Sequence, residues 1–372
     1  MSQKARVLVG ALTRETPYFK QAHGEGITVF EFDEDGGTLS RQYCQTGIDN
    51  PSFIAFDATH SHIYVTTEVF GWNEGTLSAY ALSADGRLRY INKQVTGGSI
   101  TTHTGLDRSG SFAFAVNYSH EAWEGFAEEI PGHAMAVFPL QADGGLEPPI
   151  SMVKHQGQGP VPIRQTCPHP HCAVASPDNR FVIVTDLGTD RIHSYRFRNG
   201  RLSVDGAPPP LQLEPGSGPR HFIFAPSGDR AYAINELGGT IAYLGYDAET
   251  GAFELRQTVS TLPDGYAELN NCSELQLSPD GRFLYGANRG HNSLARFAVD
   301  PQSGRLTPLG QTPTGGEWPR NFTLSPSGRH VLVANQNSDS LTIFRRDEKT
   351  GALTQTDSIA IGTPMVVKAY AI

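Results

Sequence analysis

A unit of sixteen residues occurs six times along the chain, and this repeat restricts the fold more than any other feature of the sequence. Each copy contains a short apolar run, a polar turn that usually reads Pro-Asp/Ser-Gly-Arg, and a second apolar run that ends in a polar residue. The starts of consecutive copies lie 50, 68, 50, 53 and 47 residues apart. The six copies span residues 53–68, 103–118, 171–186, 221–236, 274–289 and 321–336.

Each copy predicts a β-hairpin, because two runs rich in β-branched and aromatic residues flank a turn. Two more strands are expected after each hairpin. The first of them alternates apolar and polar residues, as in 340–344, and an Asp-x-x-x-Gly-x-Leu turn such as 347–353 leads to the second. Four antiparallel strands in about 50 residues make one blade of a β-propeller.

The two ends of the chain supply one further blade. Six complete hairpins leave an apolar run at residues 5–12 and another at 365–372. We therefore expect an all-β fold, a seven-bladed β-propeller with four antiparallel strands per blade, in a single domain over residues 1–372. Strands from both termini close this ring and so remove the exposed sheet edges of an open one. An array of two β-sandwich domains would not explain why the same sixteen-residue hairpin occurs six times.

Composition restricts the partners and the compartment. The formal net charge of −9 would repel nucleic acid and anionic membrane surfaces. No apolar stretch approaches the roughly 20 residues of a spanning helix, and the run 7–12 is too short for a signal peptide. Four cysteines do not suit a disulfide framework. We expect a cytoplasmic protein with reduced thiols, as a monomer or weak homo-oligomer, that binds neither nucleic acid nor membrane.

One short segment has the residue types of a zinc site. Residues 167–172 read Cys-Pro-His-Pro-His-Cys, which places two cysteines and two histidines close together. Structural zinc sites usually take their ligands from two separated segments, and the two prolines stiffen this one. We therefore expect neither a metal nor a cofactor.

The polar ends of the hairpins are the candidate binding site. The first residue of one strand and the last residue of its partner lie on the same rim of an antiparallel hairpin, so positions 1 and 16 of all units should surround one mouth of the central channel. Convergent arginine, histidine and glutamate side chains predict a site for a polar, anionic molecule. The expected substrate-binding residues at this mouth are Glu68, His103, Tyr118, Asp186, His221 and Arg320.

Structural roles are an alternative for some of these residues. His103, His169 and His221 could bond neighbouring loops, and Asp186 could accept N–H groups of the turn that follows it. A structural role suits Arg220 and Arg289 less well, because each has small or stiff neighbours and a planar guanidinium group can grip a carboxylate or phosphate.

Four long stretches, 168–197, 218–244, 273–300 and 315–344, resemble the lactonase family of seven-bladed propellers. This family includes bacterial propeller-type 6-phosphogluconolactonases and fungal 3-carboxy-cis,cis-muconate lactonizing enzymes. The similarity covers nearly the whole chain. The functional residues of the family occupy motif positions that match His171, Arg220, Glu236 and Arg289, which the resemblance implies as catalytic residues. All four lie on the rim expected from the hairpin geometry.

The resemblance implies hydrolysis of a sugar-acid lactone, such as 6-phosphoglucono-1,5-lactone or a related aldonic or aldaric acid lactone, to the open-chain acid. Glu236 or His171 would be the base, and Arg220 and Arg289 would stabilise the oxyanion. Because no serine lies in a nucleophile elbow, we expect direct attack by water. Two alternatives remain: a 3-carboxy-cis,cis-muconate lactonizing cycloisomerase, and a non-catalytic propeller that binds a partner.

The long spacing between the second and third copies indicates an insertion at residues 119–133. It begins at the end of a hairpin, and so at the rim of the candidate site. It could form a wall or lid over the substrate, or it could decorate the surface.

Overall fold

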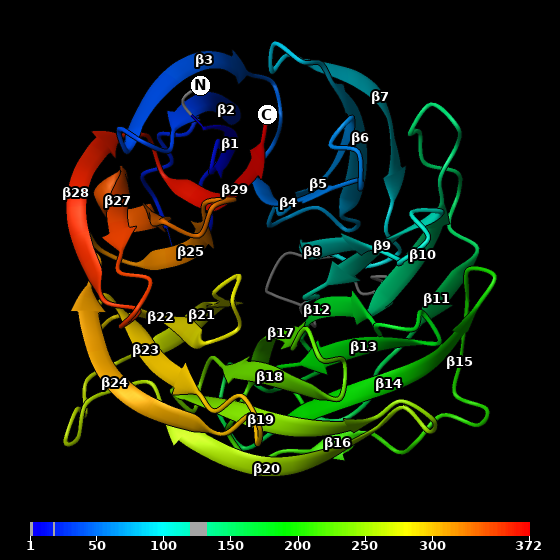
Figure 1. Cartoon of the computed structure of the whole chain (residues 1–372). Coiled ribbons are helices and arrows are strands. Elements are labelled where there is room, and N and C mark those ends of the chain that lie inside the picture. The colour runs from blue at the N-terminus through cyan, green and yellow to red at the C-terminus, as the bar shows by residue number, and fades with distance from the viewer. Residues whose placement is uncertain (1–2, 18, 120–131) are drawn as a thin grey trace.

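The computed structural model describes residues 3–17, 19–119 and 132–372, whose strands form seven antiparallel sheets arranged in a ring (Figure 1). The helical structure of this described part is one 3₁₀ turn, η1 (Gln336–Ser338). None of it forms a helix with the length and apolar character needed to cross a membrane. The predicted seven-bladed, all-β architecture is confirmed.

Each sheet is one blade, and its strands follow one another from the channel outward. Blade 1 contains β29 (Pro364–Ala371), β1 (Lys4–Ala11), β2 (Ile27–Asp33) and β3 (Thr38–Gln45). Blades 2 and 3 contain β4 (Pro51–Phe56), β5 (His62–Thr67), β6 (Thr76–Leu82) and β7 (Leu88–Val95), then β8 (Thr101–Leu106), β9 (Phe112–Asn117), β10 (Met135–Pro139) and β11 (Ser151–Val153). Blade 4 contains β12 (Pro170–Ala175), β13 (Phe181–Asp186), β14 (Arg191–Arg198) and β15 (Arg201–Ser203), with the short β16 (Leu211–Gln212) also paired to β14.

The last three blades follow the same order. Blade 5 contains β17 (Pro219–Phe224), β18 (Arg230–Asn235), β19 (Thr240–Asp247) and β20 (Ala252–Ser260). Blade 6 contains β21 (Asn271–Leu277), β22 (Phe283–Arg289), β23 (Ser293–Val299) and β24 (Leu306–Pro313). Blade 7 contains β25 (Pro319–Leu324), β26 (His330–Asn335), β27 (Ser340–Arg346) and β28 (Leu353–Ala360).

Blade 1 closes the ring with strands from both ends of the chain, as the sequence predicts. β1 lies between β29 and β2 and pairs with both: Ala5 faces Ala371 on one side and Phe32 on the other. Removal of the amino-terminal residues would therefore break two ladders of hydrogen bonds, not one.

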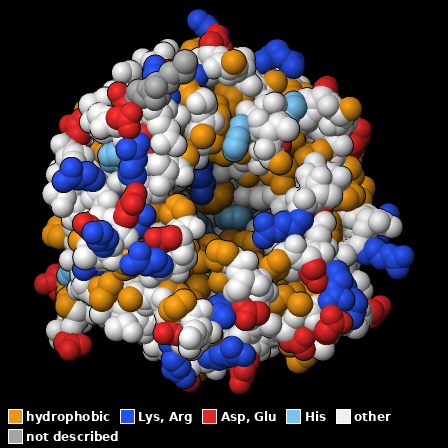
Figure 2. Space-filling model, in the orientation of Figure 1, with side chains coloured by type: hydrophobic (Ala, Val, Ile, Leu, Met, Phe, Trp, Pro, Cys, Tyr) orange, Lys and Arg blue, Asp and Glu red, His pale blue; other side chains and the backbone are white. Residues whose placement is uncertain are grey.

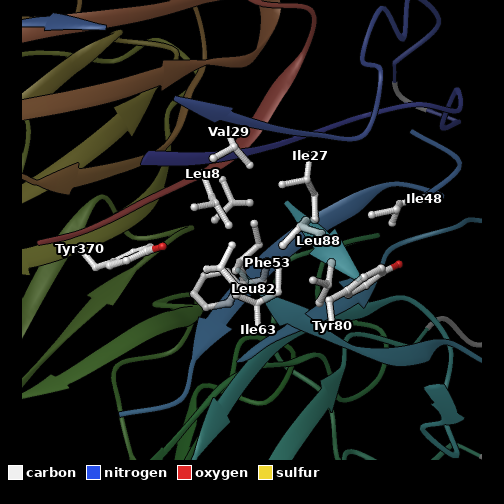
Figure 3. Close-up of a cluster of buried hydrophobic side chains, with 13 residues drawn as sticks. Leu8, Ile27, Val29, Ile48, Phe53, Ile63, Tyr80, Leu82, Leu88 and Tyr370 are labelled. Carbon is white, nitrogen blue, oxygen red and sulfur yellow. The ribbon is translucent and has the colours of Figure 1, made fainter. Parts of the chain in front are cut away.

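The described residues form a hydrophobic core of seven clusters, and each fills the space between two neighbouring blades. The cluster between blades 1 and 2 is drawn in Figure 3, where Leu8 and Val29 of blade 1 face Ile63 and Leu82 of blade 2. Apolar alternation along the strands therefore holds the blades together, and the central channel is free to carry polar side chains.

A β-bulge interrupts the innermost strand of all seven blades near its start. In blade 5 the register shifts between Pro219 and Phe222. A bulge changes the direction of side chains, so that two successive residues can point the same way. Arg220 and His221 are such a pair, because both line one small cavity in the channel.

Candidate active site

Three arginine side chains converge on the carboxylate of Glu236, which directly follows β18. Arg220 Nε and Arg289 Nη2 lie 2.8 Å and 2.7 Å from Glu236 Oε2, and Arg164 binds Oε1. Arg220 comes from the bulge of β17 and Arg289 ends β22, whereas Arg164 lies in the loop between blades 3 and 4. We call these four residues the arginine cluster.

Three members of the arginine cluster are buried, Arg164 is partly exposed, and the cluster carries excess positive charge because three guanidinium groups share one carboxylate. Arg220, Glu236 and Arg289 are at most 5% exposed. Burial, reinforced by Arg289, lowers the pKa of Arg220 to about 10. Burial alone would raise the pKa of Glu236, but Arg289, Arg164 and Arg220 outweigh it and hold this pKa well below its ordinary value. The cluster therefore suits an anionic ligand, and its glutamate is a weak base.

Arg289 is held rigidly at this site. Its guanidinium group donates hydrogen bonds to the backbone oxygens of Asn271 (3.1 Å) and Cys272 (2.9 Å) and lies over the ring of Trp318. The Asn271 side chain in turn accepts a hydrogen bond from Arg164 Nη1 at 3.1 Å. A donor fixed in this way needs little reorganisation to stabilise a charge that develops during a reaction.

His171, on β12, lies beside the arginine cluster. Its ring centroid is 5.8 Å from that of Tyr118 and 5.5 Å from that of His221. Burial, together with the charges of Arg220 and His221, holds the pKa of His171 well below its ordinary value, so the imidazole is neutral near pH 7. Within the described part of the chain, its buried Nδ1 atom has no hydrogen-bond partner. His171 therefore has a nitrogen atom that can accept a proton. Tyr118, which the sequence predicts at the channel mouth, lies beside it.

Glu68 and Arg320 form an ion pair next to the arginine cluster. Arg320 Nη2 lies 3.0 Å and 3.3 Å from the two carboxylate oxygens of Glu68, and this contact joins blades 2 and 7 across the channel. Both residues line the same small cavity as His171 and Arg220. The structure therefore brings these two predicted substrate-binding residues to the candidate site.

His103 and His221 line a larger cavity, of about 450 Å³, further along the channel. There His221 Nδ1 lies 3.0 Å from Glu274, and Lys368 Nζ lies 3.9 Å from the same carboxylate. Figure 2, which views the molecule along the channel, shows the centre hollowed, with histidine side chains inside. Arg220 Nη1 lies 3.1 Å from His221 Nε2, and this contact connects the arginine cluster with the larger cavity.

Asp186 does not reach the channel. Its fully buried carboxylate accepts hydrogen bonds from His169 N (2.8 Å) and Gly188 N (3.0 Å) on Oδ1, and Oδ2 lies 2.7 Å from His155 Nδ1. The alternative considered from the sequence, that Asp186 holds a turn, describes this geometry. The reason is local: the loop before β12 packs over Asp186 and takes up both of its oxygens.

Among the residues that the structure describes, one group of side chains has the donor types of a metal site. Donor atoms of His155, Asp186 and His193 lie within 4.8 Å of one another. In the segment considered for zinc, the two thiols face different partners: Cys172 Sγ lies 3.4 Å from His103 Nε2, and Cys167 lies near His169.

Sequence reasoning missed Arg164, Asn271 and Trp318. None of them lies within a sixteen-residue unit, so the repeat gave no reason to place them at the channel. One feature could have pointed to Arg164: it is the single cationic residue in the Pro- and Gly-rich segment 157–168. Of the insertion at 119–133, residues 120–131 lie outside the described residues.

Comparisons with known proteins identify the family to which this fold belongs. The model of the family described as "Lactonase, 7-bladed beta-propeller" matches residues 6–369. The 6-phosphogluconolactonase of Bacillus subtilis (strain 168) is 33% identical over 305 residues, 82% of each chain, and that of Formosa agariphila is 32% identical over 329 residues, 85% of each chain. The structure of the periplasmic gluconolactonase of Pseudomonas aeruginosa superimposes with a TM-score of 0.88 at 34% identity, covering 98% of this chain and 99% of that one. The chain belongs to the family of seven-bladed propeller lactonases.

Proposed function

We propose that the protein hydrolyses the lactone of a sugar acid, such as 6-phosphoglucono-1,5-lactone or a related aldonic or aldaric acid lactone, at the arginine cluster. The observation that carries this proposal is the convergence of three arginines on one buried carboxylate, which leaves positive charge for an anionic substrate and for an oxyanion. The names of the relatives from Bacillus subtilis and Pseudomonas aeruginosa support the same class of reaction.

The geometry favours His171 over Glu236 as the base. Glu236 has both carboxylate oxygens bound to arginines, so we assign it the positioning of the three guanidinium groups. The Nδ1 atom of His171 has no hydrogen-bond partner among the described residues. His171 would take a proton from water as the water oxygen attacks the ring carbonyl, while Arg220 and Arg289 stabilise the oxyanion. The ring C–O bond then breaks, and the leaving oxygen takes the proton from His171. The product carboxylic acid loses its proton to solvent.

The His171→Asn variant is expected to lower kcat by about 100-fold or more, since a positioned base commonly contributes that much. The base must be unprotonated, and its pKa is lowered. The kcat/KM of the wild-type protein should therefore stay level as the pH falls through about 6.5, where an ordinary imidazole protonates, and should decline only in stronger acid. Initial rates between about pH 4 and 8 test this. An inflection at the ordinary imidazole pKa, or full activity in the variant, would show that His171 is not the base.

A substrate panel tests the proposed function. Proton release from 6-phosphoglucono-1,5-lactone, glucono-1,5-lactone and an aldaric acid lactone, each corrected for spontaneous hydrolysis, should reveal turnover of at least one. Loss of 3-carboxymuconate, followed by ultraviolet absorbance, measures the cycloisomerase alternative, in which the same arginines would hold carboxylates. Binding of these compounds without turnover of any would favour a non-catalytic propeller.

We further propose that the protein works in the cytoplasm as a monomer or weak homo-oligomer, without nucleic acid or membrane. Its four cysteines are free, and three of them are buried, which suits a reducing compartment. The Pseudomonas aeruginosa neighbour is described as periplasmic, so cell fractionation is the direct measurement. Analytical ultracentrifugation measures the oligomeric state.

A further inference from the structure

The loop that carries Arg164, residues 154–169, joins β11 to β12 and packs on the turn 187–190 between β13 and β14. We call them the Arg164 loop and the docking turn. At Gly188 of the docking turn a Cβ atom would lie 1.9 Å from the backbone oxygen of Cys167. Only glycine allows the two segments to approach so closely.

Both ends of the Arg164 loop are bound to Asp186, the last residue of β13, which directly precedes the docking turn. Asp186 accepts the N–H of His169 at the end of the loop, and its other oxygen contacts His155 at the beginning. The N–H of Leu187 donates to the His169 oxygen at 3.0 Å. The loop is therefore fixed at its base, although it contains no strand.

Gln165, the residue after Arg164, fixes the centre of the loop. Its side chain is fully buried, and its Nε2 atom donates hydrogen bonds to the Leu187 oxygen and to Asp190 Oδ1, both at 2.7 Å. Its Oε1 atom accepts a hydrogen bond from Val161 N at 3.1 Å. One amide group therefore joins the loop to itself and to the docking turn, directly beside Arg164.

Asp190 extends this connection to the segment that carries Arg220. The Asp190 carboxylate is 1% exposed and accepts the N–H groups of Gly216 (2.8 Å) and Gly218 (2.7 Å) as well as the Gln165 amide. Gly218 lies two residues before Arg220, and its oxygen accepts the N–H of Glu236 at 2.7 Å. One carboxylate thus connects the backbone segments that deliver two arginines and the glutamate of the cluster.

We propose that Gln165 and Asp190 are positioning residues, which set Arg164 and Arg220 against Glu236 in the geometry that the reaction needs. This inference rests on the proposed function of the arginine cluster. A displacement of about 1 Å in a catalytic group can cost on the order of 100-fold in rate, so residues that act through Arg164 and Arg220 can matter as much as residues that touch substrate.

Trypsin tests the anchoring without any substrate, because Arg164 is itself a cleavage site and its side chain is 35% exposed. Gln165→Leu and Asp190→Asn should each speed cleavage of the bond after Arg164 by about tenfold or more, since cleavage requires the loop to open locally. The matched control is Asp107→Asn, because Asp107 is another buried turn aspartate that accepts backbone N–H groups, from Ser111 and Phe112, in blade 3. The rate of cleavage after the exposed Arg87 corrects for general loss of stability.

Kinetics test the positioning. Gln165→Leu should lower kcat/KM by about tenfold or more, and it should have much less effect in an Arg164→Ala background, because the two changes remove one function. Asp107→Asn should keep the activity of the parent. Gln165→Leu could be cleaved faster and still keep the kcat/KM of the parent, while Arg164→Ala loses activity. That result would overturn the positioning role but leave the proposed site intact. A fully active Arg164→Ala variant would overturn both the positioning role and the proposed site. Unchanged cleavage after Arg164 in both Gln165→Leu and Asp190→Asn would overturn the anchoring of the loop.

Discussion

Replacing Arg289 by alanine is expected to lower kcat/KM by about 100-fold or more, because removing one fixed donor to an oxyanion commonly has an effect of that size. Arg289 shares Glu236 Oε2 with Arg220 and is held by two backbone oxygens, so the variant loses one of two donors that stand in fixed positions at the site. The variant should still unfold cooperatively. Initial rates on the lactone that the parent hydrolyses best, together with thermal unfolding by circular dichroism, measure both expectations.

Two further variants show whether charge, geometry or packing accounts for the loss. Arg289→Lys keeps the positive charge but loses the planar fork, so it should recover only part of the activity. Arg346→Ala removes a comparably buried arginine in blade 7, one that donates to the backbone oxygen of Gly328, and it should leave turnover close to that of the parent. Equal losses in Arg289→Ala and Arg346→Ala would mean that the effect comes from packing and that the site is elsewhere.

Removing residues 1–12 is expected to abolish the stable fold. The deletion takes away β1, which pairs with β29 and β2, and with it the fully buried side chains of Val7, Leu8, Val9 and Leu12. Burial of each such side chain contributes about 1.5–3 kcal/mol, so the four together contribute roughly 6–12 kcal/mol. This is comparable to the whole stability of a typical domain, about 5–15 kcal/mol. Circular dichroism should show no cooperative thermal transition.

Deletion of residues 1–3 alone is the control, because β1 begins at Lys4. This shorter deletion should leave the melting temperature nearly unchanged. A synthetic peptide of residues 1–13 added to the longer deletion should restore part of the transition, since it supplies the missing strand. An unchanged melting temperature in the longer deletion would contradict the closure of the ring by β1.

The architecture could be predicted because its signals are local and repeated. Apolar alternation and turn residues recur in every blade. Six hairpins left one strand-like apolar run at each end of the sequence, and pairing these two runs gave the seventh blade. The structure confirms this fold. The bulges of the innermost strands were not predicted, because a β-bulge is a property of the pairing and leaves no mark in the alternation. The sequence predicts both Arg220 and His221 at the channel mouth, and the bulge in β17 is the local structure that lets both side chains line one cavity there.

The candidate site was predictable only where the repeat passes through it. His171, Glu236 and Arg289 stand at repeat positions, Arg220 directly precedes one, and the structure places the four together; their catalytic roles stay a prediction. Arg164 stands outside the repeat and reaches the site through a loop whose path depends on contacts with a different blade. Asp186 occupies the same repeat position as Glu236, but that loop covers it.

Closure of the ring by β1 and β29 has a consequence for the order in which the protein can fold during synthesis. β1 is synthesised well before β29 and must wait for it, and until then β1 has one unpaired edge and the interfaces of blade 1 lack β29. Such long-range pairing is slow, and an unpaired strand edge invites association with other chains. The nascent protein therefore passes through a stage in which most blades can form but the ring stays open, and protection of that single gap by a chaperone would raise the yield of folded protein.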